Sequence, residues 1–301
     1  MCGIVGLFAK SAALEQRLGE HLAAMLVQMS DRGPDSAGVA LYRDPAPTGS
    51  SKLTLFSPDP LENWQLLRDS LAESFAGCAE PRLRASHAVL TVGADASDAE
   101  EWIRDNRPDL RVMSAGLEIE IYKETGLPKE FIQRFALAKL EGSHGLGHTR
   151  MATESRVTTE GSHPFSTGLD LCLVHNGSLS NHNRLRENLR REGIRFQTEN
   201  DTEVAAGYLA WRMREGASLE QALEGCLVDL DGFYTFLVGT IDGFAVLRDP
   251  IACKPAVLAE TDEWVAMASE WGAIAVLPGA AQARSWEPAP GVVYAWERAK
   301  V

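Results

Sequence analysis

The sequence has few basic residues and lacks the cysteine patterns of disulfide-stabilised or zinc-binding domains. Its 301 residues include 29 lysines and arginines against 42 aspartates and glutamates, so the formal net charge is −13 at pH 7. This acidic balance disfavours a nucleic-acid partner or an anionic membrane surface, because both bind to basic patches. The cysteines form no C-x-x-C pair and no metal-ligand spacing: Cys2, Cys78, Cys172, Cys226 and Cys253. We therefore expect no disulfide framework and no metal site, and a reducing compartment.

Long apolar runs, a leader peptide and the common phosphate-binding loops are also missing from the sequence. No apolar stretch reaches the ~18–20 residues that span a bilayer. The apolar run at residues 3–9 has no basic segment before it and no cleavage site after it. No dinucleotide-binding glycine loop, P-loop or iron–sulfur cysteine cluster is present. These absences predict a cytoplasmic protein with no membrane contact and no cofactor of its own.

Over most of the chain, apolar residues recur at the spacing of helices or strands. The short apolar segment 3–9 is typical of a buried strand, and apolar residues at steps of three and four between Leu14 and Met29 predict a helix. Two strand-like segments on either side of Asp242-Gly243 predict a hairpin. Strands near both ends of the chain, with helices between them, indicate a layered α+β fold.

A block of different character interrupts this pattern. Residues 44–60 are rich in proline, serine and glycine, which indicates a loop, and residues 61–140 have helices and a strand of their own. The motifs before and after this block belong together, as described below. We therefore predict a single domain over residues 2–301 with an insertion at about 44–144.

Cys2 is the first candidate for chemistry. Methionine aminopeptidase removes Met1 when the next side chain is small, so the mature chain is expected to begin with Cys2. A terminal cysteine carries a nucleophile and a base on one residue, because an α-amine with a pKa of ~7.7–8.0 can accept the proton of a thiol with a pKa of ~8.5. On position alone, however, the sequence favours the interpretation that Cys2 is an accidental second residue without any function.

Cys2 belongs to the first of five short motifs that occur in a fixed order along the chain. They are MCGIVGLF at residues 1–8, DRGPDSAG at 31–38, GHTRMAT at 147–153, HNG at 175–177 and NDTE at 200–203. Together they resemble the class II glutamine amidotransferases, and the resemblance covers most of the chain outside residues 44–144. It implies the four-layer αββα sandwich of N-terminal-nucleophile hydrolases.

The resemblance implies a catalytic role for three residues. Cys2 would attack the side-chain amide of glutamine and form a thioester, with its own amine as general base and then general acid. The Asn176 side-chain amide and the Gly177 backbone N–H would stabilise the oxyanion of the tetrahedral intermediate. Taken without the other motifs, Asn-Gly is an ordinary tight turn.

The same resemblance implies a binding site for L-glutamine. Arg150 would bind the α-carboxylate through its paired donors, and Asp201 would pair with the α-ammonium. Thr153 and His163 match positions near the glutamine site, and Arg32 would support the Cys2 terminus. The structural alternatives are a salt bridge for Arg150 and a helix N-cap for Asp201.

The expected partners follow from the length of the chain. After the amidotransferase fold is built, we expect no length to remain for a domain that accepts ammonia. Among the amidotransferases, the long insertion and short C-terminus resemble the stand-alone amidotransferase subunit of glutamate-synthase-like systems, with N-methylglutamate synthase as the best candidate. The resemblance implies a hetero-oligomer in which separate synthase subunits hold flavin mononucleotide (FMN) and iron–sulfur clusters and receive ammonia. As a hypothesis, the insertion forms part of the docking surface. The alternatives are a hydrolase of another amide and a catalytically silent glutamine-sensing or assembly subunit.

Overall fold

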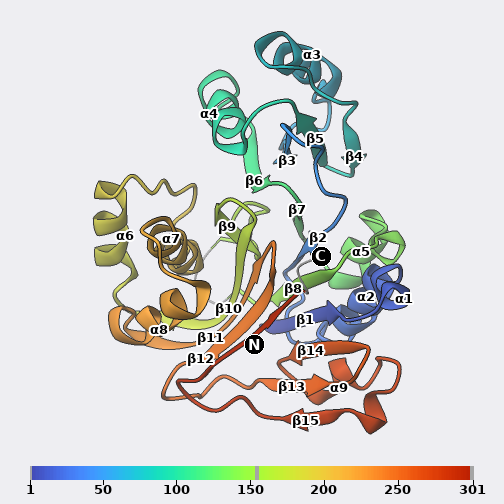
Figure 1. Cartoon of the computed structure of the whole chain (residues 1–301), viewed down its shortest axis with the longest axis vertical. Helices are drawn as coiled ribbons and strands as arrows, with labels where there is room; N and C mark the ends of the chain where they lie inside the picture. Colours follow the sequence, from blue (N-terminus) through green and yellow to red (C-terminus); the bar gives the residue numbers. More distant parts are fainter. Residues whose placement is uncertain (1, 153–155, 299–301) are drawn as a thin grey trace.

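The computed structural model describes residues 2–152 and 156–298. Its main body contains two antiparallel sheets that face one another between two layers of helices (Figure 1). The seven-stranded sheet contains, in order, β15 (Arg284–Trp286), β13 (Val257–Glu260), β14 (Trp264–Ala268), β1 (Gly3–Ala9), β8 (His144–Arg150), β2 (Ser36–Tyr42) and β7 (Ile119–Thr125). The five-stranded sheet contains, in order, β16 (Val293–Glu297), β12 (Gly243–Arg248), β11 (Gly232–Thr240), β10 (Leu171–Leu179) and β9 (Phe165–Gly168).

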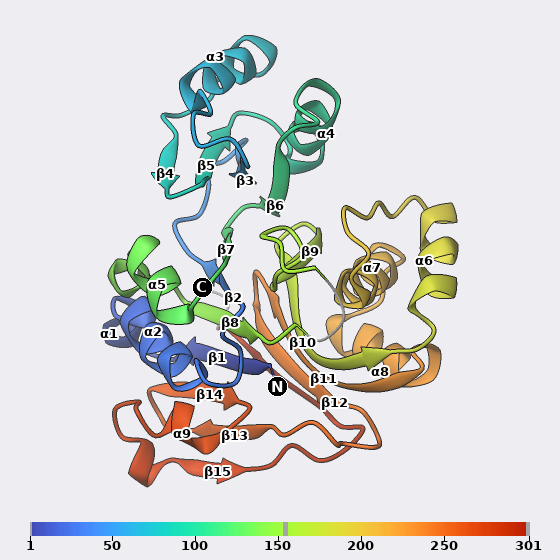
Figure 2. The same cartoon turned by 180° about the vertical axis from the view of Figure 1, so that it is seen from behind.

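Helices cover the outer face of each sheet, as Figure 2 shows from behind. The seven-stranded sheet packs against α1 (Ala12–Glu15), α2 (Leu18–Gln28), α5 (Pro128–Arg134), the 3₁₀ turn η1 (Leu137–Lys139), α9 (Trp271–Ile274) and the 3₁₀ turn η2 (Ala280–Gln282). The five-stranded sheet packs against α6 (His182–Arg191), α7 (Asp201–Arg214) and α8 (Leu219–Asp229). Each interface buries an apolar core, which is the main source of stability for such layers.

A third core lies between the two sheets. Side chains such as Ile4 and Leu146 from the seven-stranded sheet meet Val174 and Phe244 from the five-stranded sheet. All seven residues of β1 are buried, because this strand has apolar neighbours on both faces. That position explains its continuous apolar sequence. The predicted αββα sandwich is confirmed.

The hairpin of β11 and β12 was predicted, but its turn lies one residue earlier than the Asp242-Gly243 pair indicated. Thr240 pairs with Gly243, so Ile241 and Asp242 form the turn. Gly243 is needed for a different reason, since a Cβ there would lie 1.9 Å from the backbone oxygen of Trp296 in β16. The glycine thus permits the close approach of the edge strand.

A separate four-stranded sheet stands above the main body (Figure 1). It contains, in order, β4 (Arg82–Arg84), β5 (His87–Val92), β3 (Ser51–Phe56) and β6 (Arg111–Gly116), covered by α3 (Trp64–Ser74) and α4 (Ala96–Asn106). The inserted block is narrower than the predicted 44–144. Ile119–Thr125 pairs with β2 in the main sheet, and α5 packs beneath it. We propose that the chain is one domain whose inserted unit ends near Gly116.

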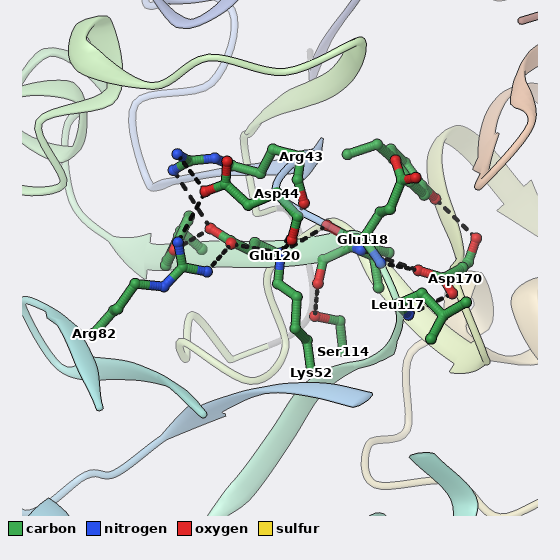
Figure 3. A network of polar contacts seen from close by, with 12 residues as sticks. Arg43, Asp44, Lys52, Arg82, Ser114, Leu117, Glu118, Glu120 and Asp170 are labelled. Carbon is green, nitrogen blue, oxygen red and sulfur yellow. Dashed lines mark hydrogen bonds and ion pairs between the residues drawn. The ribbon is translucent and has the colours of Figure 1, made fainter. Parts of the chain in front are cut away.

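An ion-pair network joins the inserted unit to the main body (Figure 3). The carboxylate of Glu120, on β7, is buried and lies 2.7 Å from Lys52 Nζ and 2.6 Å from Arg82 of the inserted unit. Lys52 also donates to the carbonyl oxygens of Arg43 and Glu118. Because buried charges are tolerated only when they are paired, this network fixes both connecting segments.

Asp170 holds the second connection from the other sheet. It lies in the turn between β9 and β10, and its carboxylate accepts backbone N–H groups of Leu117, Glu118 and Ile119 at 2.6 to 3.0 Å (Figure 3). Gly116 has φ +158°, and a Cβ there would lie 2.4 Å from the Asp170 carboxyl carbon. The inserted unit is thus attached to the hairpin that also carries Asn176 and its neighbours.

Candidate active site

Cys2 lies at the start of β1, beside the end of β8. The two strands are antiparallel with Gly3 opposite Thr149, and this register brings Cys2 next to Arg150. The Met151 backbone N–H donates to Cys2 Sγ at 3.4 Å, and Sγ lies 3.7 Å from the Met151 carbonyl oxygen. The cysteine is partly exposed, so its thiol is held by backbone at the edge of the sheet.

The Cys2 carbonyl oxygen connects two further predicted site residues. Asn176 Nδ2 and Arg32 Nε each donate to it at 3.1 Å. Arg32 in turn forms an ion pair with Glu270. The structure therefore brings Cys2, Asn176 and Arg32 together, and it places Arg32 where it can support the Cys2 terminus.

The Asn176 side chain is oriented from both ends of its amide. His148 Nε2 lies 3.2 Å from both Asn176 Oδ1 and the His175 carbonyl oxygen, and because both are acceptors, Nε2 carries the proton. Asn176 Nδ2 also lies 3.2 Å from Ser269 Oγ, which accepts the Ile4 backbone N–H. The amide N–H₂ group is thereby turned toward Cys2.

Gly177 follows on the same strand with a backbone conformation that favours glycine. Its φ is +149°, and a Cβ would lie 2.0 Å from the backbone oxygen of Phe233 and 2.6 Å from His175 Nε2. Any larger residue would move the strand and, with it, the neighbouring Asn176. Gly177 itself is exposed, in contrast to the buried Asn176.

Arg150 is the last residue of β8 and is 6% exposed. Its Nη1 donates to the carbonyl oxygens of Gly161, at 3.2 Å, and Arg156, at 3.4 Å. Asp35 of the second motif supports the same turn, because its N–H donates to the Arg150 carbonyl and its carboxylate accepts the Ala152 N–H. The predicted carboxylate-binding arginine is therefore held by a loop that follows it.

Asp201 is not the helix N-cap that sequence alone allowed. Asn200 is the N-cap of α7, with its side chain accepting the Thr202 N–H at 2.9 Å, and Asp201 is the first helical residue. The short carboxamide at Asn200 takes the cap, which leaves the Asp201 carboxylate to accept the Leu179 N–H at 3.0 Å. Asp201 Oδ1 also lies 3.9 Å from His175 Nδ1.

His163 and Thr153 were predicted near the glutamine site. His163 is buried, and its Nε2 lies 2.8 Å from Thr202 Oγ1, which also contacts His175 Nδ1 at 3.0 Å. Its ring stacks on His148 at a centroid distance of 4.0 Å. Thr153 lies outside the described residues. Sequence reasoning gave no role to Thr202 or Ser269, because hydroxyls that bridge distant strands have no local signature.

Three buried histidines thus lie behind the predicted oxyanion donors. Burial lowers the pKa of His148 to about 3, and it lowers the pKa of His163 well below its ordinary value. Burial also lowers the pKa of His175, although the Asp201 carboxylate opposes that shift. All three rings are therefore neutral near pH 7 and serve as a polar support rather than as charges.

Because these histidines are neutral in the folded chain, we expect the folded state to lose stability as the pH falls. Each histidine has a lower pKa in the folded chain than the ~6.5 of the unfolded chain, so below pH 6.5 the unfolded state binds more protons. The free energy of unfolding should then fall by about 1.4 kcal/mol per pH unit for each ring that stays neutral in the folded chain. The buried His87 and His144, whose pKa burial also lowers to about 3, add to the same fall. Denaturant unfolding at pH 7.5 and 5.5 measures this difference. Equal stabilities at the two values would contradict the neutral assignment.

Metal and membrane sites do not emerge from the described part of the chain. Within residues 2–152 and 156–298, no group of three or more His, Cys, Asp or Glu side chains is placed to hold a metal ion. No helix in these same ranges is long and apolar enough to cross a bilayer.

The fold and this site define a class. The αββα sandwich, with a cysteine at the start of its central strand β1, is the fold that the resemblance to N-terminal-nucleophile hydrolases implied. Residues 148–276 match a family model described as glutamine amidotransferase domain. The chain is 56% identical over 301 residues to the glutamine amidotransferase-like protein GlxB of Rhizobium meliloti (strain 1021). The alignment covers 100% of this chain and 99% of that protein.

More distant relatives agree with that match. A glutamine–fructose-6-phosphate aminotransferase of Vibrio vulnificus (strain YJ016) is 35% identical over 116 residues, 38% of this chain and 19% of that enzyme. The solved glutamine phosphoribosylpyrophosphate amidotransferase of B. subtilis superposes with a TM-score of 0.63 at 21% identity, over 98% of this chain and 47% of that chain, and shows the same fold. The chain belongs to the class II glutamine amidotransferases.

Proposed function

We propose that this chain is the glutaminase subunit of a larger synthase, which hydrolyses L-glutamine at Cys2 and delivers ammonia to a separate partner subunit. The resemblance described above favours a glutamate-synthase-like system in the cytoplasm, with N-methylglutamate synthase as the first candidate. FMN and iron–sulfur clusters would then belong to the partner and not to this chain. The observation that carries the proposal is the contact of Asn176 Nδ2 with the Cys2 carbonyl oxygen, at 3.1 Å.

This contact supports the proposal because it brings the Asn176 amide beside the residue whose thiol is the proposed nucleophile. In the proposed reaction the free α-amine of Cys2 takes the thiol proton while Sγ attacks the side-chain amide carbon of glutamine. The negative charge that develops on the amide oxygen is stabilised by Asn176 Nδ2 and the Gly177 N–H. The amine then protonates the leaving nitrogen, so that ammonia departs and a thioester remains.

Hydrolysis of the thioester completes the turnover. The same amine takes a proton from water, the resulting hydroxide attacks the thioester carbon, and the C–S bond breaks. Glutamate leaves and the thiol recovers its proton. Cys2 thus supplies nucleophile, base and acid, which explains why the reaction needs no histidine and why the three buried rings can remain neutral.

Two opposite charges support glutamine as the substrate. Arg150 at the end of β8 would bind the α-carboxylate, and Asp201 at the start of α7 would bind the α-ammonium. Both are anchored by backbone, Arg150 through Gly161 and Asp201 through Leu179. A free amino acid has both charges on one carbon, whereas an internal peptide amide has neither, so this pair disfavours hydrolysis of another amide.

The proposal is tested by incubating Met1-processed protein with L-glutamine and measuring glutamate and ammonia in equal amounts. Activity of the chain alone supports a glutaminase. If the isolated chain is silent, the assay is repeated with the synthase subunit bound. Binding of glutamine without turnover in that complex would favour the alternative of a silent sensing or assembly subunit.

The inserted unit is the proposed docking surface for the synthase subunit. Three leucines are exposed on it, Leu61 at 87%, Leu66 at 63% and Leu83 at 59%, and they line adjoining grooves around α3. Exposed apolar groups that gather in this way mark interaction surfaces. The network of Figure 3 would transmit the partner's position to the β9–β10 hairpin.

Replacing all three leucines by serine should therefore prevent co-purification with the co-expressed synthase subunit and leave the glutaminase fold intact. Loss of central apolar anchors typically costs about 1 kcal/mol or more each in binding. Val228→Ser on α8, where the side chain is 84% exposed, is the matched control. Unchanged assembly of the leucine variant would contradict this docking site.

A further inference from the structure

Lys123 is a buried lysine for which the proposed reaction has no use. It lies on β7, is 4% exposed and packs with Nζ 4.4 Å from the centroid of the Phe165 ring. Its Nζ donates to three backbone carbonyl oxygens, those of Glu160 at 3.1 Å, Ser162 at 2.8 Å and Pro164 at 3.0 Å. Burial lowers the pKa of Lys123 to about 7. In its protonated form the amine has three N–H donors, and these alternate carbonyls of one loop satisfy all of them.

That loop connects Arg150 with the segment that carries Asp201, the two residues proposed to bind the charges of glutamine. The Gly161 carbonyl oxygen accepts Arg150 Nη1 at 3.2 Å and Asn200 Nδ2 at 3.5 Å. Asn200 is the N-cap that precedes Asp201, so a single peptide group lies between the two charged residues. His163 adds a second link from the same loop through its contact with Thr202 on α7.

The loop is also packed against the sheet without spare room. A Cβ at Gly38, on the neighbouring strand β2, would lie 2.1 Å from the His163 carbonyl oxygen and 2.6 Å from Lys123 Cβ. Within the loop, Ser162 Oγ donates to the Thr158 carbonyl oxygen at 2.8 Å, so the segment behaves as one body. Lys123 thus holds this loop through three of its backbone carbonyl groups.

We propose that Lys123 is a positioning residue for glutamine: it fixes residues 160–164 so that Arg150 and Asp201 hold the spacing of the two charges on an α-amino acid. This inference rests on the proposed function of the site. Lys123 acts through the loop and need not touch the substrate. Its loss should therefore weaken the binding of glutamine more than it slows the chemistry at Cys2.

The test compares two buried lysines. Lys123→Met keeps the apolar stem but removes the three donors, and the KM for glutamine should rise about 10- to 100-fold, as expected for lost charge-assisted hydrogen bonds, with a much smaller change in kcat. Lys52→Met is the matched control, because Lys52 also donates to backbone carbonyls but at the base of the inserted unit. It should lower stability and leave KM unchanged.

The outcomes separate this inference from the proposed function. The affinity for L-glutamine is also measured by calorimetry in the Cys2→Ala background, so that a chain without turnover still decides the role of Lys123. Normal hydrolysis with an unchanged KM and affinity in Lys123→Met, or an equal rise in Lys52→Met, would overturn the role of Lys123 alone. Absence of both hydrolysis and glutamine binding in the wild-type protein would overturn both proposals.

If Lys123→Met does not fold, Lys123→Gln, which keeps two N–H donors, should give an intermediate KM.

Discussion

Cys2→Ala is expected to abolish the release of glutamate and ammonia from L-glutamine. Removing a nucleophile lowers kcat on the order of 10⁴- to 10⁶-fold, and the neighbouring groups cannot replace it. The Cys2 carbonyl contacts with Asn176 and Arg32 do not involve the thiol, so the variant should fold and bind glutamine as before. Coupled glutamate and ammonia assays, with binding measured in parallel, check both expectations.

Cys2→Ser is the matched control for this result. It keeps the α-amine and a hydroxyl at nearly the same place but replaces the thiol by a much poorer nucleophile. We expect it to bind glutamine normally and to turn over far more slowly than the wild-type protein. Activity of Cys2→Ala within tenfold of the wild-type protein would rule out Cys2 as the nucleophile.

The second large effect is expected at Asn176. Asn176→Ala removes an oxyanion donor, and such a loss typically lowers kcat about 10²- to 10³-fold while KM changes little. Rapid kinetics with saturating glutamine measures the decrease. The expected result depends on the amide N–H₂ group alone, because it is this group that faces Cys2 and Ser269.

Asn176→Asp separates the lost donor from lost packing. Aspartate has nearly the same shape and still accepts the His148 N–H, but it has no N–H₂ group and adds negative charge where the oxyanion forms. It should be at least as slow as the alanine variant. A kcat close to that of the wild-type protein in either variant would contradict the role of Asn176 as oxyanion donor.

The main body of the fold could be predicted because its signals are local. The apolar segment 3–9 is continuous since β1 is covered on both faces. The apolar residues between Leu14 and Met29, predicted as one helix, are divided between α1 and α2, but they face one core as expected. Arg150 and Asp201 lie at the end of a strand and the start of a helix, whereas Asn176 and Gly177 lie within β10. The relation of Cys2 to Asn176 followed from a family pattern rather than from periodicity.

Other features depend on contacts between distant segments and could not be read in this way. The strand 119–125 carries the buried charged residues Glu120 and Lys123 among apolar ones, because its partners are Lys52 and the 160–164 loop. A sequence pattern cannot show that such charges are paired, so this strand was assigned to the insertion. The N-cap at Asn200 rather than Asp201 likewise depended on a distant contact, because the Asp201 carboxylate accepts the Leu179 N–H of β10 while Asn200 accepts the Thr202 N–H.

The central claim is that glutamine reacts with the thiol of Cys2 at a free N-terminus. The most direct test is to treat Met1-processed protein with an electrophilic glutamine analogue, such as a diazoketone, and to locate the adduct by peptide mass spectrometry. The account predicts one adduct on the N-terminal peptide at Cys2, suppressed by excess L-glutamine and strongly weakened in Arg150→Met. Labelling of Cys78 or Cys253 in its place, or no adduct with the synthase subunit bound, would contradict it.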